Sequence, residues 1–153
     1  MSIGEAKAEA VAERWIERTL ASYPAGTIPA PGGARDRFRD PAGHTIRQTL
    51  ATLARELLGG MDDLVMAQAL DAIVRLRAVQ GFAPSAAIGF VFELRGVAAA
   101  ARGALPTDLD ERIDRLARMA FDQYMACRDR VAELREKELR MRLHYAVNSR
   151  MEP

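Results

Sequence analysis

The chain has 153 residues, enough for one domain with a sizeable core and hardly enough for two. Its formal net charge of +1 argues against a general nucleic-acid binder, which needs a basic excess to release counterions. The single cysteine, Cys127, excludes both an internal disulfide and a metal site with several thiolates. We therefore predict one helical domain spanning residues 1–153. We expect it in the cytoplasm and not in the membrane, since the N-terminus is polar and no apolar run approaches the roughly 20 residues that cross a bilayer.

The first predicted helix covers residues 4–21. Its apolar residues recur every three or four positions, and Trp15, the only tryptophan, is expected to anchor the core. Tyr23-Pro24 ends this helix, because the residue before a proline is pushed out of the α region. The following segment, residues 23–34, is rich in proline and glycine, and we expect a loop there.

Cap and breaker residues bound the next three helices, which we predict at residues 41–58, 62–80 and 84–101. Asp40 is the expected N-cap of the second helix, with Pro41 at the first helical position. The first half of the fourth helix is apolar nearly all round, which is typical of a helix packed on several sides. We expect a neighbouring helix to come close at Gly89.

The last predicted helix, residues 107–147, is unusually long. Thr107 and Asp108 are its N-cap candidates, and no further proline or glycine occurs before Pro153. Its apolar positions follow a helical stripe: Ile113, Leu116, Ala120, Tyr124, Cys127, Val131, Leu134, Met141 and Tyr145. Such a helix would be roughly 60 Å long, whereas a compact domain of this size is about 30–35 Å across. The expected fold is therefore an all-α five-helix bundle (about residues 4–129) with a projecting helical tail (about 130–150).

A projecting apolar stripe needs a partner. We predict that a second copy of the chain or a partner protein packs on the C-terminal part of the stripe, at Tyr124, Cys127, Val131, Leu134, Met141 and Tyr145. Cys127 has two further interpretations, a redox sensor or a disulfide across a dimer. The pattern favours a small buried hydrophobe, because nothing in the sequence indicates a lowered thiol pKa.

Four segments of the chain together resemble a known family. They are residues 14–24 (RWIERTLASYP), 37–44 (RFRDPAGH), 69–85 (ALDAIVRLRAVQGFAPS) and 121–128 (FDQYMACR). In this order and spacing they resemble the N-terminal domain of the RsbT co-antagonist protein RsbRD. The resemblance covers nearly the whole chain, and the set of segments, not any single one, is specific.

The resemblance implies a helical sensory or regulatory input domain of bacterial stress signalling. Such domains precede output modules, among them anti-sigma-antagonist domains, histidine kinases and DNA-binding regulators. Related co-antagonist domains resemble globins that bind no haem, and they dimerise. The resemblance therefore implies a homodimer and a globin-like fold without haem. Because the sequence ends at Pro153 without an output domain, we expect it to signal through a partner protein. The resemblance assigns no functional residue.

His44 is a candidate ligand-binding residue near the start of the second helix. It could be a metal ligand, a haem ligand or a pH sensor. A metal site needs more ligands than His44 and the nearby Asp40, and the only other histidine, His144, lies in the tail. The pattern favours a locally hydrogen-bonded or exposed histidine, and we expect no haem, metal or other cofactor.

Arg77 is the second candidate, because it falls near the apolar stripe of the third helix. With Arg37 or Arg39 it could form an anion pocket at the start of the second helix, where backbone N–H groups point outward. The alternative is an internal ion pair with an acidic residue, for which the candidates are Asp71, Asp122 and Glu93. Internal arginines are usually paired, so the pattern favours the ion pair.

No set of residues predicts catalysis, so we expect a non-enzymatic signalling or sensor domain. Serine, histidine and aspartate form no recognisable catalytic set, and no zinc-protease or di-iron motif occurs. Two alternatives remain. One is a protein that binds a small anion or lipid in a pocket between the second, third and fourth helices. The other is an accessory subunit of a larger redox complex.

Overall fold

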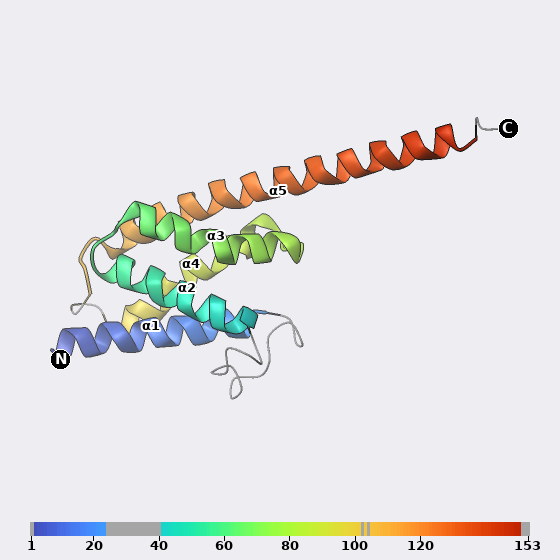
Figure 1. Ribbon diagram of the computed structural model, residues 1–153. Helices are drawn as coiled ribbons and strands as arrows, with labels where there is room; N and C mark the ends of the chain where they lie inside the picture. The colour runs from blue at the N-terminus through green and yellow to red at the C-terminus, as the bar shows by residue number, and fades with distance from the viewer. Residues whose placement is uncertain (1, 24–40, 102, 104, 151–153) are drawn as a thin grey trace.

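The structure is a computed structural model that describes residues 2–23, 41–101, 103 and 105–150. These residues form five α-helices and one short 3-10 turn, and no strand occurs among them. The all-α prediction with a long last helix is therefore confirmed. In chain order the elements are α1 (Ile3–Ala21), α2 (Pro41–Leu58), α3 (Asp63–Val79), α4 (Pro84–Ala98), η1 (Ala99–Ala101) and α5 (Leu109–Asn148) (Figure 1).

Local side-chain contacts fix where α1 and α3 begin. The Ser2 hydroxyl accepts a hydrogen bond from the Glu5 backbone N–H at 3.1 Å, and the Glu5 carboxylate accepts one from the Ser2 backbone N–H at 2.6 Å. This reciprocal capping box satisfies two N–H groups that the helix cannot use itself, and it lowers the pKa of Glu5. Asp62 caps α3 by accepting from the N–H groups of Leu64 and Val65.

The start of α5 is at the predicted place, with Asp108 at the N-cap position, although the capping contact of its side chain differs from that of Ser2 and Asp62. Asp108 occupies the N-cap position without a side-chain capping bond. Its carboxylate instead pairs with Arg112, one turn later, at 2.9 Å. The hydrogen bond with Arg112 lowers the pKa of Asp108. The acidic residue therefore supports the first turn through an ion pair along the helix surface.

The helices surround a single core. α1 packs on α2 and α4, α2 packs on α3, and α5 packs on both α3 and α4. Trp15 of α1 is fully buried at the centre, as the sequence predicts, and its Nε1–H donates to the carbonyl oxygen of Phe90 at 2.6 Å. The Trp15 and Phe90 rings stack with their centroids 6.1 Å apart. This pair joins the first helix to the fourth across 75 residues of sequence.

The close approach predicted at Gly89 does not occur. A Cβ atom added at Gly89 would meet no described atom within 4 Å. α4 enters the core through other positions, chiefly Phe90, Val91 and Leu94, all of which are buried. Gly89 lies between the buried positions Ala87 and Phe90, and no neighbouring helix in the described part of the chain uses the space that its lack of a side chain leaves.

The stretch Pro84–Ala101 is long and apolar enough to cross a membrane by length and composition, with a mean hydropathy of 1.2. The uninterrupted apolar runs of the sequence are shorter than this stretch, so they predict no membrane span. One such helix is weak evidence for a membrane span, and 33% of this one is buried inside the bundle. In the structure α4 packs on α1 and α5 and contributes Phe90, Val91 and Leu94 to the core.

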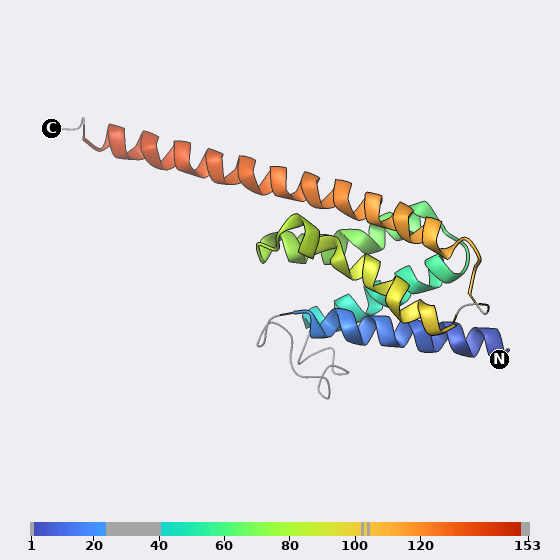
Figure 2. The ribbon, with the colours of Figure 1, turned by 180° about the vertical axis from the view of Figure 1, so that it is seen from behind.

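The second half of α5 extends beyond the other helices. α5 is 40 residues long, and both views show its C-terminal half projecting away from the bundle (Figures 1 and 2). The last buried residue of the helix is Tyr124, Val131 is half-buried, and every described residue from 132 to 150 is exposed. The first half of α5 therefore packs against the other helices, and its second half is surrounded by solvent.

Candidate functional site

Arg77 lies in the last turn of α3 and is only 1% exposed. Its Nε–H donates to the Tyr23 hydroxyl at 2.9 Å. Its Nη1 donates to the carbonyl oxygens of Ala86 and Ala87 at 3.0 and 3.2 Å, and its Nη2 reaches the Ser22 hydroxyl at 3.4 Å. One guanidinium group thus joins the end of α1, the end of α3 and the first turn of α4.

Three aromatic rings surround this guanidinium. Its carbon lies 4.7 Å from the ring centroid of Tyr23, 5.1 Å from that of Phe82 and 4.9 Å from that of Phe90. An aromatic face is electron-rich, so rings at these distances attract a cation, and the attraction is stronger when water is excluded. We refer to Arg77, Tyr23, Phe82 and Phe90 as the arginine cluster.

The arginine cluster contains no carboxylate among the described residues, so the predicted ion partners of Arg77 are wrong. Asp71 pairs instead with Arg75 at 2.8 Å, and neither Asp122 nor Glu93 contacts Arg77. The charge is stabilised by two carbonyl oxygens, two hydroxyl groups, aromatic faces and the negative ends of α1 and α3. The prediction that Arg77 holds elements together agrees with these contacts, although the chemistry of the contacts differs.

The arginine cluster shifts the pKa of the Tyr23 hydroxyl. Burial raises the pKa of the Tyr23 hydroxyl above its ordinary value of 10.0, while the charge and hydrogen bond of Arg77 act in the opposite direction. The phenol therefore stays protonated near neutral pH. It accepts from Arg77 through its oxygen and keeps its own proton.

The structure does not bring all four predicted ligand residues together. Arg37 and Arg39 lie outside the described residues, as does the predicted cap Asp40. His44 is in the first turn of α2, half-buried, and is not one of the hydrogen-bond partners of Arg77. Among the residues that the structure describes, no group of three histidine, cysteine or acidic side chains is placed to hold a metal ion.

The predicted interface residues of α5 fall into two groups. Tyr124 is fully buried in its own bundle, and its hydroxyl donates to the carbonyl oxygen of Phe82, so it offers no surface to a partner. Cys127 is half-buried and packs against the core. Beyond half-buried Val131, the stripe is open: Leu134 is 67% exposed, Met141 53% and Tyr145 73%. The assignment of Tyr124 to the interface is therefore corrected, and we call Val131, Leu134, Met141 and Tyr145 the tail stripe.

Three surface hollows among the described residues lie between other pairs of helices, and the pocket that the sequence suggested between α2, α3 and α4 stays a prediction. One, of about 450 Å³, separates α1 from α2 near Ala12 and Ala51. The second, about 270 Å³, lies at the junction of α4 and α5. The third, about 390 Å³, is a groove between α4 and α5 that exposes apolar side chains, among them Ile88, Phe92 and Phe121.

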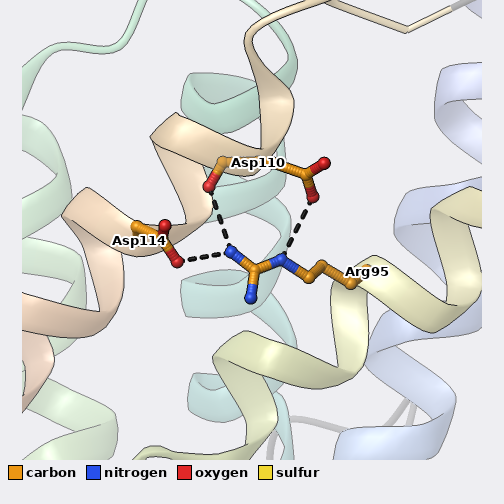
Figure 3. Close-up of polar contacts among 3 residues, drawn as sticks. All are labelled: Arg95, Asp110 and Asp114. Atoms are coloured by element: carbon orange, nitrogen blue, oxygen red, sulfur yellow. Dashed lines mark hydrogen bonds and ion pairs between the residues drawn. The ribbon is translucent and has the colours of Figure 1, made fainter.

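An ion-pair cluster closes the junction of α4 and α5. Arg95 near the end of α4 faces the first turns of α5, where its Nε donates to Asp110 at 3.1 Å and its Nη2 to Asp114 and to the carbonyl oxygen of Asp110 (Figure 3). These bonds, that with Asp114 foremost, raise the pKa of Arg95. The three side chains are partly exposed, so the cluster orients the two helices more than it stabilises the fold.

Sequence reasoning found Arg77 but missed the residues around it. In the sequence Tyr23 is identified only as the residue that ends the first helix before Pro24, and Phe82 only as part of the segment 69–85. Each stands beside a helix breaker, Pro24 or Gly81, which is a position where a chain turns back across a helix end. That an aromatic residue follows two helix ends was the available signal.

Comparison with known proteins gives one positive result. The family model described as the RsbT co-antagonist protein rsbRD N-terminal domain matches residues 9–139. No curated protein matches the chain. No solved structure matches it either, so the globin-like arrangement implied by the resemblance stays a prediction.

Proposed function

Because this chain belongs to the family of RsbT co-antagonist protein rsbRD N-terminal domains, a family of stress-signalling regulatory domains, we propose that it is a non-enzymatic regulatory domain. It acts in the cytoplasm as a homodimer and passes its signal to a partner protein. The bundle is the input part, and the projecting half of α5 is the output part. The observation that carries this proposal is the 40-residue α5, whose second half leaves the bundle with apolar side chains exposed.

The tail stripe is the proposed contact for the partner protein. Exposed leucine, methionine and tyrosine side chains along one helix gain free energy when another surface covers them, at about 25 cal/mol for each Å² removed from water. The charged residues around them bond within the helix: Arg140 pairs with Glu136, and Arg142 pairs with Glu138 at 2.6 Å. These internal pairs keep the helix formed while the tail stripe stays free.

A paired substitution tests the partner contact. Val131→Asp with Leu134→Asp puts charge on the tail stripe without touching a fully buried residue. We expect the melting temperature of the bundle to be unchanged. We also expect the wild-type chain to retain one stoichiometric protein from lysate of its own organism, and the aspartate variant to lose it. The matched control is Glu133→Gln with Arg135→Gln, which changes the neighbouring charges and should retain the partner. Retention by the aspartate variant would contradict the proposal. Sedimentation of the wild-type chain at micromolar concentration tests the homodimer separately, and a monomer would contradict it.

A small-anion site at Arg77 is a second candidate function. The observation that favours it is a buried guanidinium with no carboxylate partner among the described residues and with one long bond, 3.4 Å, to the Ser22 hydroxyl. Thermal melting with phosphate, sulfate and citrate tests this candidate. An anion at 100 times its Kd should stabilise the wild type by about 2.7 kcal/mol. The exposed-surface control Arg75→Gln should be stabilised as much as wild type, whereas Arg77→Gln should lose the effect. Equal stabilisation of Arg77→Gln would indicate a general salt effect and reject the site.

A further inference from the structure

The bundle exposes apolar side chains on the α4–α5 face. Phe92 of α4 is 42% exposed, and Phe121 and Met125 of α5 are 44% and 38% exposed. Ile88 lies beside Phe92 and Phe121 in the groove between the two helices. Three other exposed apolar residues of the bundle, Ile3, Leu64 and Val79, instead sit at helix ends. We call Ile88, Phe92, Phe121 and Met125 the outer patch.

The outer patch is on a different side of α5 from the tail stripe. With 100° between successive residues of an α-helix, Phe121 and Met125 lie about 160° around the axis from Leu134 and Met141. The tail stripe prolongs the side of α5 that faces the bundle, whereas the outer patch lies on the flank of α5 that borders α4. One helix therefore carries two separate apolar surfaces, and a single partner helix cannot cover both.

Two charged residues flank Phe121 without an ion partner in the part of the chain that the structure describes. They are Arg118 and Asp122, both exposed and both at the edge of the groove. Acid-first pairs one turn apart do bond in this chain, as Asp71–Arg75 and Asp108–Arg112 show. Arg118 and Asp122 are in the reverse order, which is the less favourable one along a helix. Their charges are thus open to a partner.

We propose that a second copy of the chain packs on the outer patch with the two α5 helices antiparallel, so that Arg118 of each copy faces Asp122 of the other. This inference rests on the proposed homodimer and deepens it. A two-fold axis repeats every contact, so one Arg118–Asp122 match makes two ion pairs, one on each side of the paired Phe121 rings. In a parallel arrangement each charge would face its own copy, which is repulsive.

The antiparallel arrangement leaves the tail stripe free. A two-fold axis midway between Arg118 and Asp122 lies about 20 Å along the helix from Leu134, so the two tails point away from each other. Dimer formation and partner binding then use different surfaces of one helix, and a signal that alters the bundle can reach two partner molecules.

Charge reversal tests the arrangement by sedimentation over a concentration series. Arg118→Asp and Asp122→Arg should each weaken dimerisation about tenfold or more, and the double variant should restore it to within about threefold of wild type. Phe121→Asp should weaken it at least as much, while the control Leu64→Asp, an exposed apolar residue elsewhere, should leave it unchanged. Circular dichroism shows whether each variant keeps its helices.

The opposite outcomes separate this inference from the proposed function. If Arg118→Gln, which removes the charge, tightens the dimer, the helices are parallel and the inference is wrong, although the homodimer stands. The same follows if Val131→Asp with Leu134→Asp abolishes the dimer and Phe121→Asp does not. A wild-type chain that remains monomeric overturns both proposals.

Oxidation of the chain gives an independent reading of orientation. In the antiparallel dimer the two Cys127 residues are about 20 Å apart along the helices, too far for a disulfide, which needs Cα atoms within about 7 Å. We expect no disulfide-linked dimer from the native chain and a linked dimer from Phe121→Cys in a Cys127→Ser background. A linked dimer through native Cys127, or none through position 121, would overturn the antiparallel arrangement.

Discussion

Arg77 donates from Nε to the hydroxyl of Tyr23 at 2.9 Å, across 54 residues of sequence and inside the core. The bond joins the end of α1 to the end of α3, and the ring of the same tyrosine lies 4.7 Å from the guanidinium carbon. A residue at the end of α1 is thus held by the core of the bundle. Changes in this contact should alter stability in ways that can be measured.

Replacing Arg77 tests the arginine cluster. Arg77→Met fills much of the same volume but leaves the Tyr23 hydroxyl and two carbonyl oxygens without their donor. We expect a loss of about 2–4 kcal/mol in the free energy of unfolding, measured by urea denaturation. Arg77→Lys should also destabilise, because an ammonium group cannot match the planar fork of donors. The control Arg75→Met, at an exposed ion pair, should cost less than about 1 kcal/mol. A lysine variant as stable as wild type would contradict this account.

The raised pKa of Tyr23 predicts a loss of stability at high pH. Because the folded state holds the phenol proton more tightly than the unfolded state, the stabilisation is complete below the unfolded pKa of about 10. It is lost as the pH rises through the higher folded pKa. Urea denaturation between about pH 9 and pH 11 should therefore show a steeper fall for wild type than for Tyr23→Phe. Identical slopes in the two proteins would show that another group titrates.

Tyr124 should act on stability and not on assembly. Its hydroxyl donates to the carbonyl oxygen of Phe82 and the residue is fully buried. Removing the hydroxyl in Tyr124→Phe leaves that carbonyl without this donor, at a cost of about 1–2 kcal/mol in urea denaturation. The sedimentation behaviour should be that of wild type. A change in oligomeric state at unchanged stability would return Tyr124 to the interface.

Gly89 offers a stabilising substitution. It lies inside α4, and an added Cβ would meet no described atom within 4 Å. Gly89→Ala should raise the free energy of unfolding by roughly 0.5–1 kcal/mol, because alanine loses less backbone entropy in a helix. The matched control is Gly81→Ala, where φ is +74° and a side chain is strained. Gly81→Ala should destabilise, and a loss of stability at Gly89 would reveal a neighbour that we have not identified.

Much of the fold followed from local sequence. The bounds of the helices agree with those predicted to within a few residues, because proline, glycine and capping residues act on neighbours a turn away. The long α5 was predicted for the same reason, since nothing between Asp108 and Pro153 interrupts a helix. The family could also be identified from the order of four segments, and the family model agrees.

The candidate site was harder to predict because its contacts join distant segments. The stripe of α5 looked continuous in sequence, yet Tyr124 is buried and Leu134, ten positions later, is exposed. Periodicity shows which side of a helix is apolar but not where the neighbouring helices end. Arg37, Arg39 and Asp40 lie outside the described residues, so their part of the prediction stays a prediction.

By itself the sequence determined the number of helices, their limits, the family and the excess length of α5, since each depends on residues that are close in the chain or on their order. Only the tertiary structure decided that Arg77 is surrounded by aromatic rings and carbonyl groups instead of acids, and that α5 carries a second apolar surface at Phe121. The reason is physical: a buried charge is stabilised by whatever groups the packing of several helices brings within bonding distance, and that packing depends on all five helices together.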